Sequence, residues 1–386
     1  MAEEPTSATF GPNDWLVDEM FEQYTRDPSS VSESWRDFFE DYRPPATAGN
    51  GASAPVAATP APTPAAAPVA PAPSEPATAA PAAPAPVAAA APAAAASAAA
   101  ATEADVSTDT AEVAAPIRGA GARIVANMEA SLTVPTATSA RVVPAKLLEV
   151  NRKILNNHLA RTRGGKVSFT HLIGYAVIKG LKAMPAMNST FVAGDDGKPA
   201  VIHHEHVGLG LAVDVEKSDG SRTLLVPVIK HADTMDFRGF FTAYETLIRK
   251  VRANKIGVDD FGGVTVTLTN PGTIGTVHSV PRLMPGQGVI VGVGAMDYPA
   301  EYQAADSRLL ANLGLSKVIT ITSTYDHRII QGAESGLFLQ RVHRLLLGED
   351  GFYDEIFRSL RIPYQPIRWS HDISTSHDDE ISKQAR

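Results

Sequence analysis

The spacing of apolar side chains divides the chain into helical and extended stretches. Apolar residues that recur every three or four positions predict amphipathic helices at 13–43, 145–161, 171–184 and 236–253. Runs of β-branched residues bounded by Gly, Asn, Pro or Asp predict strands at 207–215, 223–229, 263–268, 288–294 and 318–325. Because the two patterns alternate, we expect an α/β domain with a mixed sheet.

The first 43 residues form an amphipathic unit of their own. The pattern predicts two short helices, with a turn at Asp27-Pro28-Ser29-Ser30 and with Ser32 as the N-cap of the second helix. A pair of helices this short cannot bury its large apolar side chains within itself. It must dock on its own chain or on a partner, and we expect a partner.

Residues 44–115 lack the side chains that a folded core needs. Ala and Pro dominate this stretch, which has no aromatic residue. Such a composition cannot offset the entropy of ordering, so we expect a disordered, semi-stiff Ala/Pro linker. An ordinary globular composition follows at 116–350 and predicts one large domain. Residues 351–386 are polar and end without a hydrophobic closure, so we expect a second linker that leads to a further domain.

Composition and charge exclude several classes of function. The chain has no cysteine, which removes disulfides and thiolate nucleophiles and fits a cytoplasmic location. Its formal net charge is −8 and no basic stripe stands out, so nucleic acid is not an expected partner. We find neither a targeting peptide nor an apolar run long enough to span a membrane. The expected partners are proteins and small molecules.

Two short patterns suggest metal or nucleotide chemistry only superficially. The cluster His203-His204-Glu205-His206 lies in an extended stretch, where adjacent side chains point to opposite faces, so we do not expect a metal site. The pair Gly208-Leu209-Gly210 lies inside a predicted strand, with no third glycine and no helix after it. We therefore do not expect a nucleotide there.

The sharpest chemical feature is the stretch STYDHRIIQGA at 323–333, where a strand ends in a polar cluster before a helix that opens with glycine. A histidine at a strand end can accept a proton near neutral pH, and this makes His327 a candidate base. Asp326 and Arg328 can hold its ring or the neighbouring backbone. On this stretch alone a structural histidine is as good an interpretation, because the chain has eleven histidines.

A second feature is VTVTLTNPGTIG at 264–275, a predicted strand that runs into a turn rich in hydroxyls and backbone amides. Such a turn can donate hydrogen bonds to an oxyanion. Alone it is better explained as an ordinary Asn-Pro-Gly turn.

Together the two stretches resemble the dihydrolipoamide acyltransferase family, the E2 components of 2-oxo acid dehydrogenase complexes. The DHR of 326–328 and the TxTNxG of 267–272 are the signatures of that family. The resemblance covers nearly all of 116–350, since 123–128 is similar to the first helix of the family domain and 211–214 and 225–229 are similar to its central strands. It implies a chloramphenicol acetyltransferase-like two-layer sandwich, usually trimeric.

The resemblance also implies roles for individual residues. The residue matching His327 accepts the thiol proton of coenzyme A or dihydrolipoamide, and the hydroxyl matching Thr269 stabilises the tetrahedral intermediate. Asn270, Asp326 and Arg328 are expected to support them, and in trimers the two sides of the site come from adjacent subunits. One position departs from the family pattern HxxxDG, because Gln331 replaces the usual aspartate. A neutral amide cannot offset the charge of an imidazolium, although it can hold a group by hydrogen bonding.

The N-terminal unit resembles another protein of the same complexes. FGPNDWL at 10–16 and WRDFF at 35–39 are similar to the N-terminal assembly arm of 2-oxoglutarate dehydrogenase, the E1 decarboxylase. No lipoyl domain is apparent between this arm and the acyltransferase domain, so we expect dihydrolipoamide to arrive in trans on a lipoyl-bearing acyltransferase.

The order of arm, linker and acyltransferase domain resembles fused E1/E2 enzymes of actinobacterial 2-oxoglutarate metabolism. In that family an E1 domain follows, so thiamine diphosphate and Mg are expected only in a longer parent chain. The E1-type arm favours succinyl as the acyl group. The alternative hypothesis is a trimeric scaffold or coenzyme A-sensing domain with little turnover.

Overall fold

The computed structural model describes residues 14–42, 117, 120–162, 164–194, 197–216 and 222–368. The expected linker at 44–115 and the end of the polar tail, 369–386, lie outside the described residues. None of the helices in the described part of the chain is long and apolar enough to cross a membrane.

The helices that the apolar spacing predicts are present, and their ends lie close to the expected positions. The helices of the described residues are α1 (Asp14–Arg26), α2 (Glu33–Asp41), α3 (Ala120–Ser131), α4 (Lys146–Arg161), α5 (Phe169–Ala183), α6 (Phe237–Arg252), α7 (Ser307–Asn312), α8 (Gly332–Leu346) and α9 (Phe352–Ser359). The strands are β1 (Thr136–Pro144), β2 (Ser189–Ala193), β3 (Pro199–His203), β4 (Leu209–Leu211), β5 (Val213–Glu216), β6 (Arg222–Leu225), β7 (Val228–Ile229), β8 (Val266–Thr269), β9 (Val289–Val293) and β10 (Val318–Asp326).

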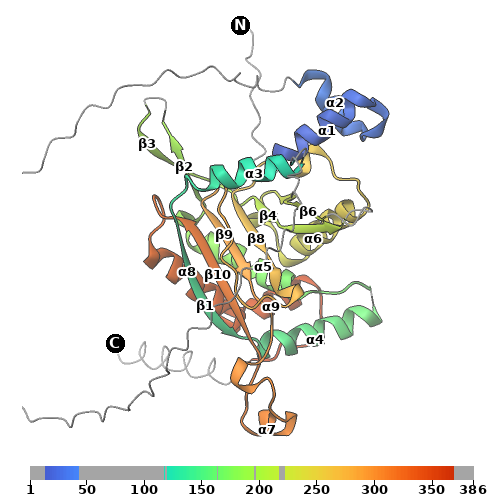
Figure 1. The fold of residues 1–386 in the computed structure, drawn as a ribbon. Coiled ribbons are helices and arrows are strands. Elements are labelled where there is room, and N and C mark those ends of the chain that lie inside the picture. The colour runs from blue at the N-terminus through green and yellow to red at the C-terminus, as the bar shows by residue number, and fades with distance from the viewer. Residues whose placement is uncertain are drawn as a thin grey trace, which may run out of the picture. The chain divides into compact units, whose positions relative to one another are not determined.

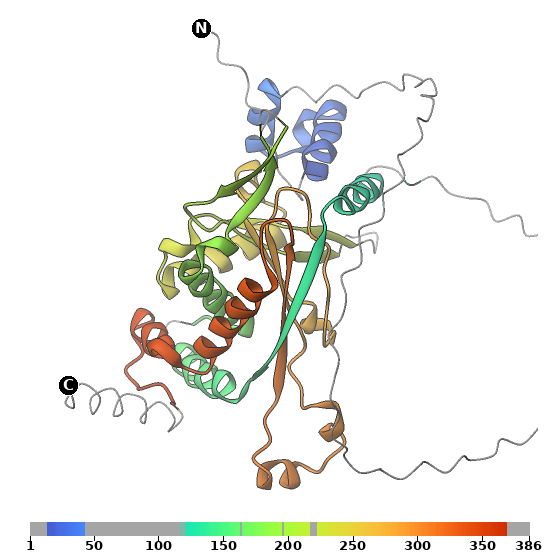
Figure 2. The same ribbon diagram turned by 90° about the vertical axis from the view of Figure 1, so that its left-hand side faces the viewer.

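A mixed sheet organises the domain, as expected. Among the described residues, six strands pair in the order β1-β10-β9-β8-β4-β7, with β8 parallel to both β4 and β9 and the other pairs antiparallel. Helices α5 and α8 pack together beside the sheet, and the loop between β9 and β10, which carries α7, extends away from it (Figures 1 and 2). The α/β fold class is confirmed.

Strand β10 shows how the sheet divides apolar from polar side chains. Ile319, Ile321 and Tyr325 alternate along the strand and belong to the core that the helices share. Thr322 and Thr324, between them, are also buried, but their hydroxyls hydrogen-bond to Ser279 O at 3.1 Å and to Thr138 Oγ1 at 2.8 Å. One face of β10 is therefore mainly apolar, and the other carries hydroxyls.

Two predicted strands are wrong as continuous elements. The expected strand 207–215 divides at Ala212 into β4 and β5, and the expected strand 223–229 divides at Pro227 into β6 and β7. Strands β4 and β7 remain in the main sheet, whereas β5 and β6 form a separate hairpin. Proline has no N–H to donate to a ladder, so the sheet cannot continue evenly through this position. Leu211 N–H instead donates to Pro227 O at 2.8 Å.

The expectation that a linker begins at residue 351 is wrong for its first part. Residues 352–359 form α9, with Phe352, Tyr353, Ile356 and Phe357 all at most 2% exposed. These four residues recur at helical spacing, and the charged residues between them lie on the opposite face. The many polar residues of this segment led to the prediction of a linker, whereas the segment contains an amphipathic helix that packs on the core.

The N-terminal helix pair packs on its own chain rather than standing free for a partner. The Trp35 side chain is 2% exposed, and its indole N–H donates to Ile256 O at 3.3 Å. Helix α2 begins after Ser32 as predicted, but the Ser32 hydroxyl lies 3.2 Å from Ser34 Oγ and does not cap the helix backbone. The expected partner is thus replaced by the segment that follows α6.

Gly208, which immediately precedes β4, lies against the backbone of the segment that leads into β8. A Cβ built on Gly208 would lie 1.8 Å from the backbone oxygen of Gly263, so only glycine permits this close passage of two backbones.

We expect Gly208→Ala to lower the free energy of unfolding by about 1–3 kcal/mol or more, because the backbone cannot move aside without displacing β8. Denaturant unfolding measures this change. Gly336→Ala is the matched control, since a Cβ there meets nothing within 4 Å and the residue lies inside α8. The control should be neutral or stabilising, by up to about 1 kcal/mol. Equal effects of the two substitutions would contradict this explanation.

Candidate active site

A buried carboxylate organises the end of β10. Asp326 is 2% exposed, and its Oδ1 accepts hydrogen bonds from the backbone N–H of Arg328 at 3.0 Å and from Arg328 Nε at 2.9 Å. Its Oδ2 accepts from Arg328 Nη2 at 2.6 Å. The side-chain hydrogen bond to Asp326 raises the pKa of Arg328. The hydrogen bonds between the two side chains and to the Arg328 backbone hold residues 326–328 in one conformation.

His327 lies between these two residues and has a different environment. Its side chain is exposed, and its backbone N–H donates to Pro135 O at 2.9 Å. The imidazole lies edge-on to the Tyr325 ring, with 5.5 Å between the ring centroids. The backbone of His327 is thus anchored while its ring remains open to a reactant.

The guanidinium of Arg328 has a second contact that the sequence did not indicate. It lies 3.7 Å from the centroid of the Phe191 ring, which belongs to β2. Strand β2 was not among the predicted strands, so nothing in the sequence pattern connected Phe191 with this site. Arg328 therefore contacts both the hairpin of β2 and β3 and the end of β10.

Gln331 begins the helix that follows the histidine. It is the N-cap residue of α8, and its backbone N–H donates to Glu334 Oε2 at 2.7 Å. Its side chain is exposed. Gln331 thus follows the turn that contains His327 and precedes the first residue of α8.

The second predicted stretch is a strand end followed by a tight turn. Thr269 is the last residue of β8 and is half-buried, and the Asn270 side chain donates through Nδ2 to Thr170 Oγ1 at 2.7 Å. A Cβ on Gly272 would lie 2.3 Å from the backbone oxygen of Gly294. Glycine at that position lets the turn pack directly on the end of β9. The sequence analysis did not identify Thr170 as part of this site, because in the sequence it is an ordinary residue in the first turn of a helix.

The sheet register separates Thr269 from His327 within one chain. Thr269 pairs with Gly292 on β9, and Gly292 pairs with Thr322 on β10. His327 lies five residues beyond Thr322, which is about 17 Å along the strand, and two strand spacings add about 10 Å sideways. The two residues therefore lie toward opposite ends of the sheet, too far apart to contact one small reactant together.

The histidines of the His203–His206 cluster make separate contacts. The Ser189 hydroxyl lies 2.8 Å from His203 Nδ1, and the Thr190 hydroxyl lies 2.8 Å from His204 Nε2. His206 Nδ1 lies 3.1 Å from an oxygen of Asp233. Burial lowers the pKa of His204. Each ring has its own partner, and no group of three His, Asp or Glu residues suited to a metal occurs among the described residues.

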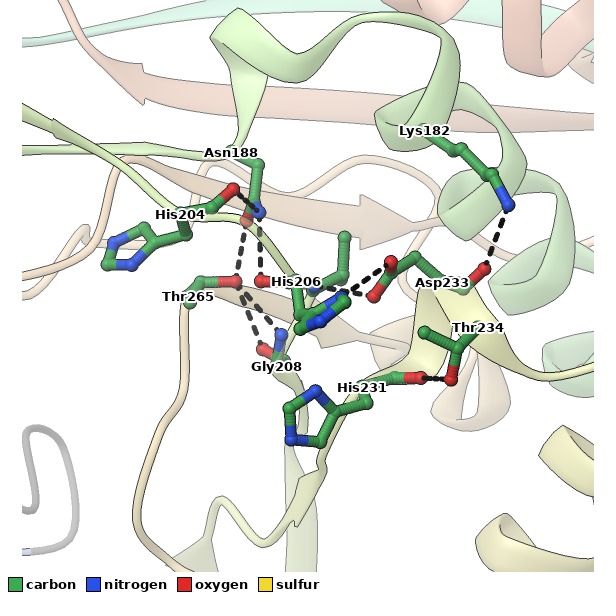
Figure 3. A network of polar contacts seen from close by, with 10 residues as sticks. Lys182, Asn188, His204, His206, Gly208, His231, Asp233, Thr234 and Thr265 are labelled. Carbon is green, nitrogen blue, oxygen red and sulfur yellow. Dashed lines mark hydrogen bonds and ion pairs between the residues drawn. The ribbon is translucent and has the colours of Figure 1, made fainter.

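Figure 3 shows how this region is joined by polar contacts. The Asn188 side chain donates through Nδ2 to His204 O at 3.2 Å and to His206 O at 3.0 Å, and its Oδ1 accepts from the Thr265 hydroxyl at 2.6 Å. Asn188 is 3% exposed, so these partners satisfy a buried amide. The network connects the start of β2 with the approach to β8 and has a structural role.

Two family models match this chain. Residues 109–350 match the model described as 2-oxoacid dehydrogenases acyltransferase (catalytic domain). Residues 6–46 match the model described as 2-oxoglutarate dehydrogenase N-terminus.

Two curated relatives that match nearly the whole chain have the same name. The chain is 53% identical over 387 residues to a multifunctional 2-oxoglutarate metabolism enzyme of Mycolicibacterium vanbaalenii, and 54% identical over 402 residues to one from Mycobacterium sp. strain JLS. The match covers 97% of this chain in both cases, but only 31% and 32% of the relatives. This chain therefore spans about a third of the length of those relatives.

Solved acyltransferase cores share the fold. The cubic core of a pyruvate dehydrogenase multienzyme complex superposes with a TM-score of 0.52 at 26% identity, over 67% of this chain and 98% of that chain. A dihydrolipoamide acetyltransferase of Azotobacter vinelandii gives 0.50 at 27% identity, over 62% of this chain and 90% of that chain. Together with the family model, these similarities show that the chain belongs to the 2-oxoacid dehydrogenase acyltransferases, through their catalytic domain.

Proposed function

We propose that this chain transfers a succinyl group between dihydrolipoamide and coenzyme A, with His327 as the general base. The observation that carries the proposal is the structure at the end of β10. There the buried Asp326 hydrogen-bonds to the backbone and the guanidinium of the more exposed Arg328, on either side of an exposed imidazole. A family of acyltransferases provides the reaction class.

The reaction needs a base because its nucleophile is a thiol. A free thiol has a pKa of about 8.5 and is mostly protonated at neutral pH. The neutral imidazole of His327 accepts the thiol proton, and the sulfur attacks the carbonyl carbon of the acyl thioester. The tetrahedral intermediate then collapses, its C–S bond to the donor breaks, and the leaving thiolate takes the proton back from the imidazolium. The acyl group has moved and no proton is gained or lost.

Thr269 is the proposed hydrogen-bond donor to the oxyanion of that intermediate. A hydroxyl at a strand end, next to the tight Asn270–Gly272 turn, can be held in place before the reaction begins. Because the register puts it far from His327 of the same chain, we infer that each site combines His327 of one subunit with Thr269 of another. A homotrimer, as the family resemblance implies, supplies such a pairing.

Gln331 is compatible with turnover. In the solved acetyltransferase of Azotobacter vinelandii, the catalytic mechanism has been studied at a serine, a histidine and, four residues after the histidine, an asparagine. Gln331 likewise follows His327 by four residues and has a side-chain amide. An amide at this position can orient the neighbouring turn by hydrogen bonding without neutralising an imidazolium.

The acyl group and the partners follow from the N-terminal arm and the relatives. An arm of the 2-oxoglutarate dehydrogenase type favours succinyl, the acyl group formed when 2-oxoglutarate is decarboxylated and the remaining fragment is oxidised by the lipoamide disulfide. We infer that a lipoyl-bearing acyltransferase provides dihydrolipoamide in trans, and that an E1 domain with thiamine diphosphate and Mg follows in a longer cytoplasmic parent.

Removing the base should nearly stop the reaction. We expect His327→Ala to lower the rate of succinyl transfer from succinyl-coenzyme A to dihydrolipoamide by about 10²–10⁴-fold, the usual contribution of a general base. Thr269→Ala should lower it by about 10²–10³-fold. His158→Ala is the matched control, because His158 lies on α4 and its ring packs beside Tyr364. A wild-type chain that folds and oligomerises without any turnover would leave the scaffold hypothesis instead.

Mixing the two inactive variants tests the shared site. If His327→Ala and Thr269→Ala chains are dissociated and reassembled together, random mixing restores both residues in about a quarter of the sites, and about a quarter of wild-type activity should return. Each variant reassembled alone is the control. No recovery in mixtures whose hybrid trimers are verified by mass would refute a site built from two subunits.

The amide at 331 can be exchanged for the usual carboxylate. We expect Gln331→Asp to change the rate by less than about 10-fold and to stabilise α8 slightly, because Asp is a good N-cap residue. A carboxylate there favours the imidazolium, so the acid limb of the pH–rate profile should move to higher pH. Gln331→Asn keeps the amide and should leave the profile unchanged. Activity that appears only in the aspartate variant would mean that the wild-type site has lost turnover.

A further inference from the structure

The N-terminal arm, residues 14–42, is built around its own aromatic rings. The rings of Trp35 and Phe39 are stacked with 5.3 Å between centroids, and the Phe21 ring meets Phe39 edge-on at 5.3 Å. Tyr24 and Tyr42 complete the cluster, at 5.4 Å and 5.6 Å from Phe39. These contacts connect α1 and α2 to each other, so the arm presents a defined surface.

The acyltransferase domain presents a matching surface just after α6. Ile256 and Val258 are 8% and 7% exposed, and Ile256 O accepts the Trp35 indole N–H. Between them, Gly257 has no side chain, and a Cβ built on it would lie 3.0 Å from Ser34 Oγ. The backbone of Gly257 is extended, with φ −103°, so this glycine is not required by its conformation. A side chain at this position would meet Ser34 of α2. We call residues 256–260 the arm receptor.

Chain connectivity does not decide which arm fills which receptor. Residues 43–119 lie between the arm and α3, and a chain of that length can span up to about 250 Å when fully extended. The contacts described above are made only by residues of the arm and of the receptor, and none of them involves residues 43–119. An arm from a neighbouring chain can therefore make the same contacts as the arm of the same chain.

The two sides of this contact also match two different families. The arm lies within the 2-oxoglutarate dehydrogenase N-terminus match, and the receptor lies within the acyltransferase match. The contact is thus a recognition of an E1-type segment by an acyltransferase domain, and it does not involve His327 or Thr269.

We propose that residues 256–260 are an exchangeable receptor for this arm, and that the arm of a second copy of the chain can occupy it. Neighbouring copies then exchange arms, and each exchanged arm links two acyltransferase domains. The buried indole of Trp35 is the anchor of the interaction.

A labelled peptide tests the receptor on the full chain. A fluorescein-labelled peptide of residues 12–44 is titrated into the full-length Trp35→Ala variant, whose own arm has lost its anchor, and fluorescence anisotropy measures binding. We expect saturable binding with one peptide per chain. Wild type should bind at least about 10-fold more weakly, because its own arm competes for the receptor.

The matched control blocks the receptor instead of the arm. In the double variant Trp35→Ala/Gly257→Lys, a side chain occupies the space that Ser34 needs, and peptide affinity should fall on the order of 100-fold. The extended backbone of Gly257 accepts a lysine, so circular dichroism should remain unchanged. A peptide with Trp35→Ala should not bind either variant.

The remaining outcomes are decisive as well. Equal binding to the single and double variants, or no binding to a folded Trp35→Ala chain, would overturn the proposal. If Trp35→Ala does not fold, Ser34→Lys empties the receptor by the same steric contact from the arm side, and the same expectations apply. Acyl transfer is measured in parallel and should not change, so failure here is distinct from failure of the proposed function.

Discussion

The buried carboxylate of Asp326 is the constraint on which the candidate site depends. A carboxylate that is 2% exposed must be paired, because removing a charge from water without partners costs several kcal/mol. Arg328 supplies the pairing through its backbone N–H and its guanidinium. These hydrogen bonds connect the residues on either side of His327. The same guanidinium packs on Phe191, so one ion pair fixes the strand end, the histidine backbone and the hairpin of β2 and β3.

The register of the central sheet imposes the second constraint. Because β10 runs antiparallel to β8 and β9, its last residues lie at the end of the sheet opposite to Thr269. A single chain cannot bring the proposed base and the proposed oxyanion donor to one thioester. Oligomerisation is therefore part of the proposed chemistry and not only a means of stability.

The N-terminal arm shows how two families meet in one chain. Its aromatic residues pack on a turn of the acyltransferase domain, where Gly257 leaves room for Ser34. A helix pair of this size buries its rings only by docking, as its composition indicates. The structure supplies the docking surface within the chain, whereas sequence reasoning favoured a separate partner. The proposed exchange of the arm between copies uses the length of the intervening segment and the same contacts that the arm makes within its own chain.

The sequence by itself determined the α/β class, the long helices and the two stretches that contain Thr269 and His327. It could do so because amphipathic periodicity and strand-end motifs are local properties. Tertiary structure decided what depends on contacts between distant segments. The polar strand β1 was not predicted, because only its nine-residue pairing with β10 makes it a strand. Helix α9 was predicted as part of a linker, because its charged residues outweighed the periodic spacing of four residues that are buried in the structure. The contact between Phe191 and Arg328 and the separation of His327 from Thr269 arise from strand order and register, which no local pattern encodes.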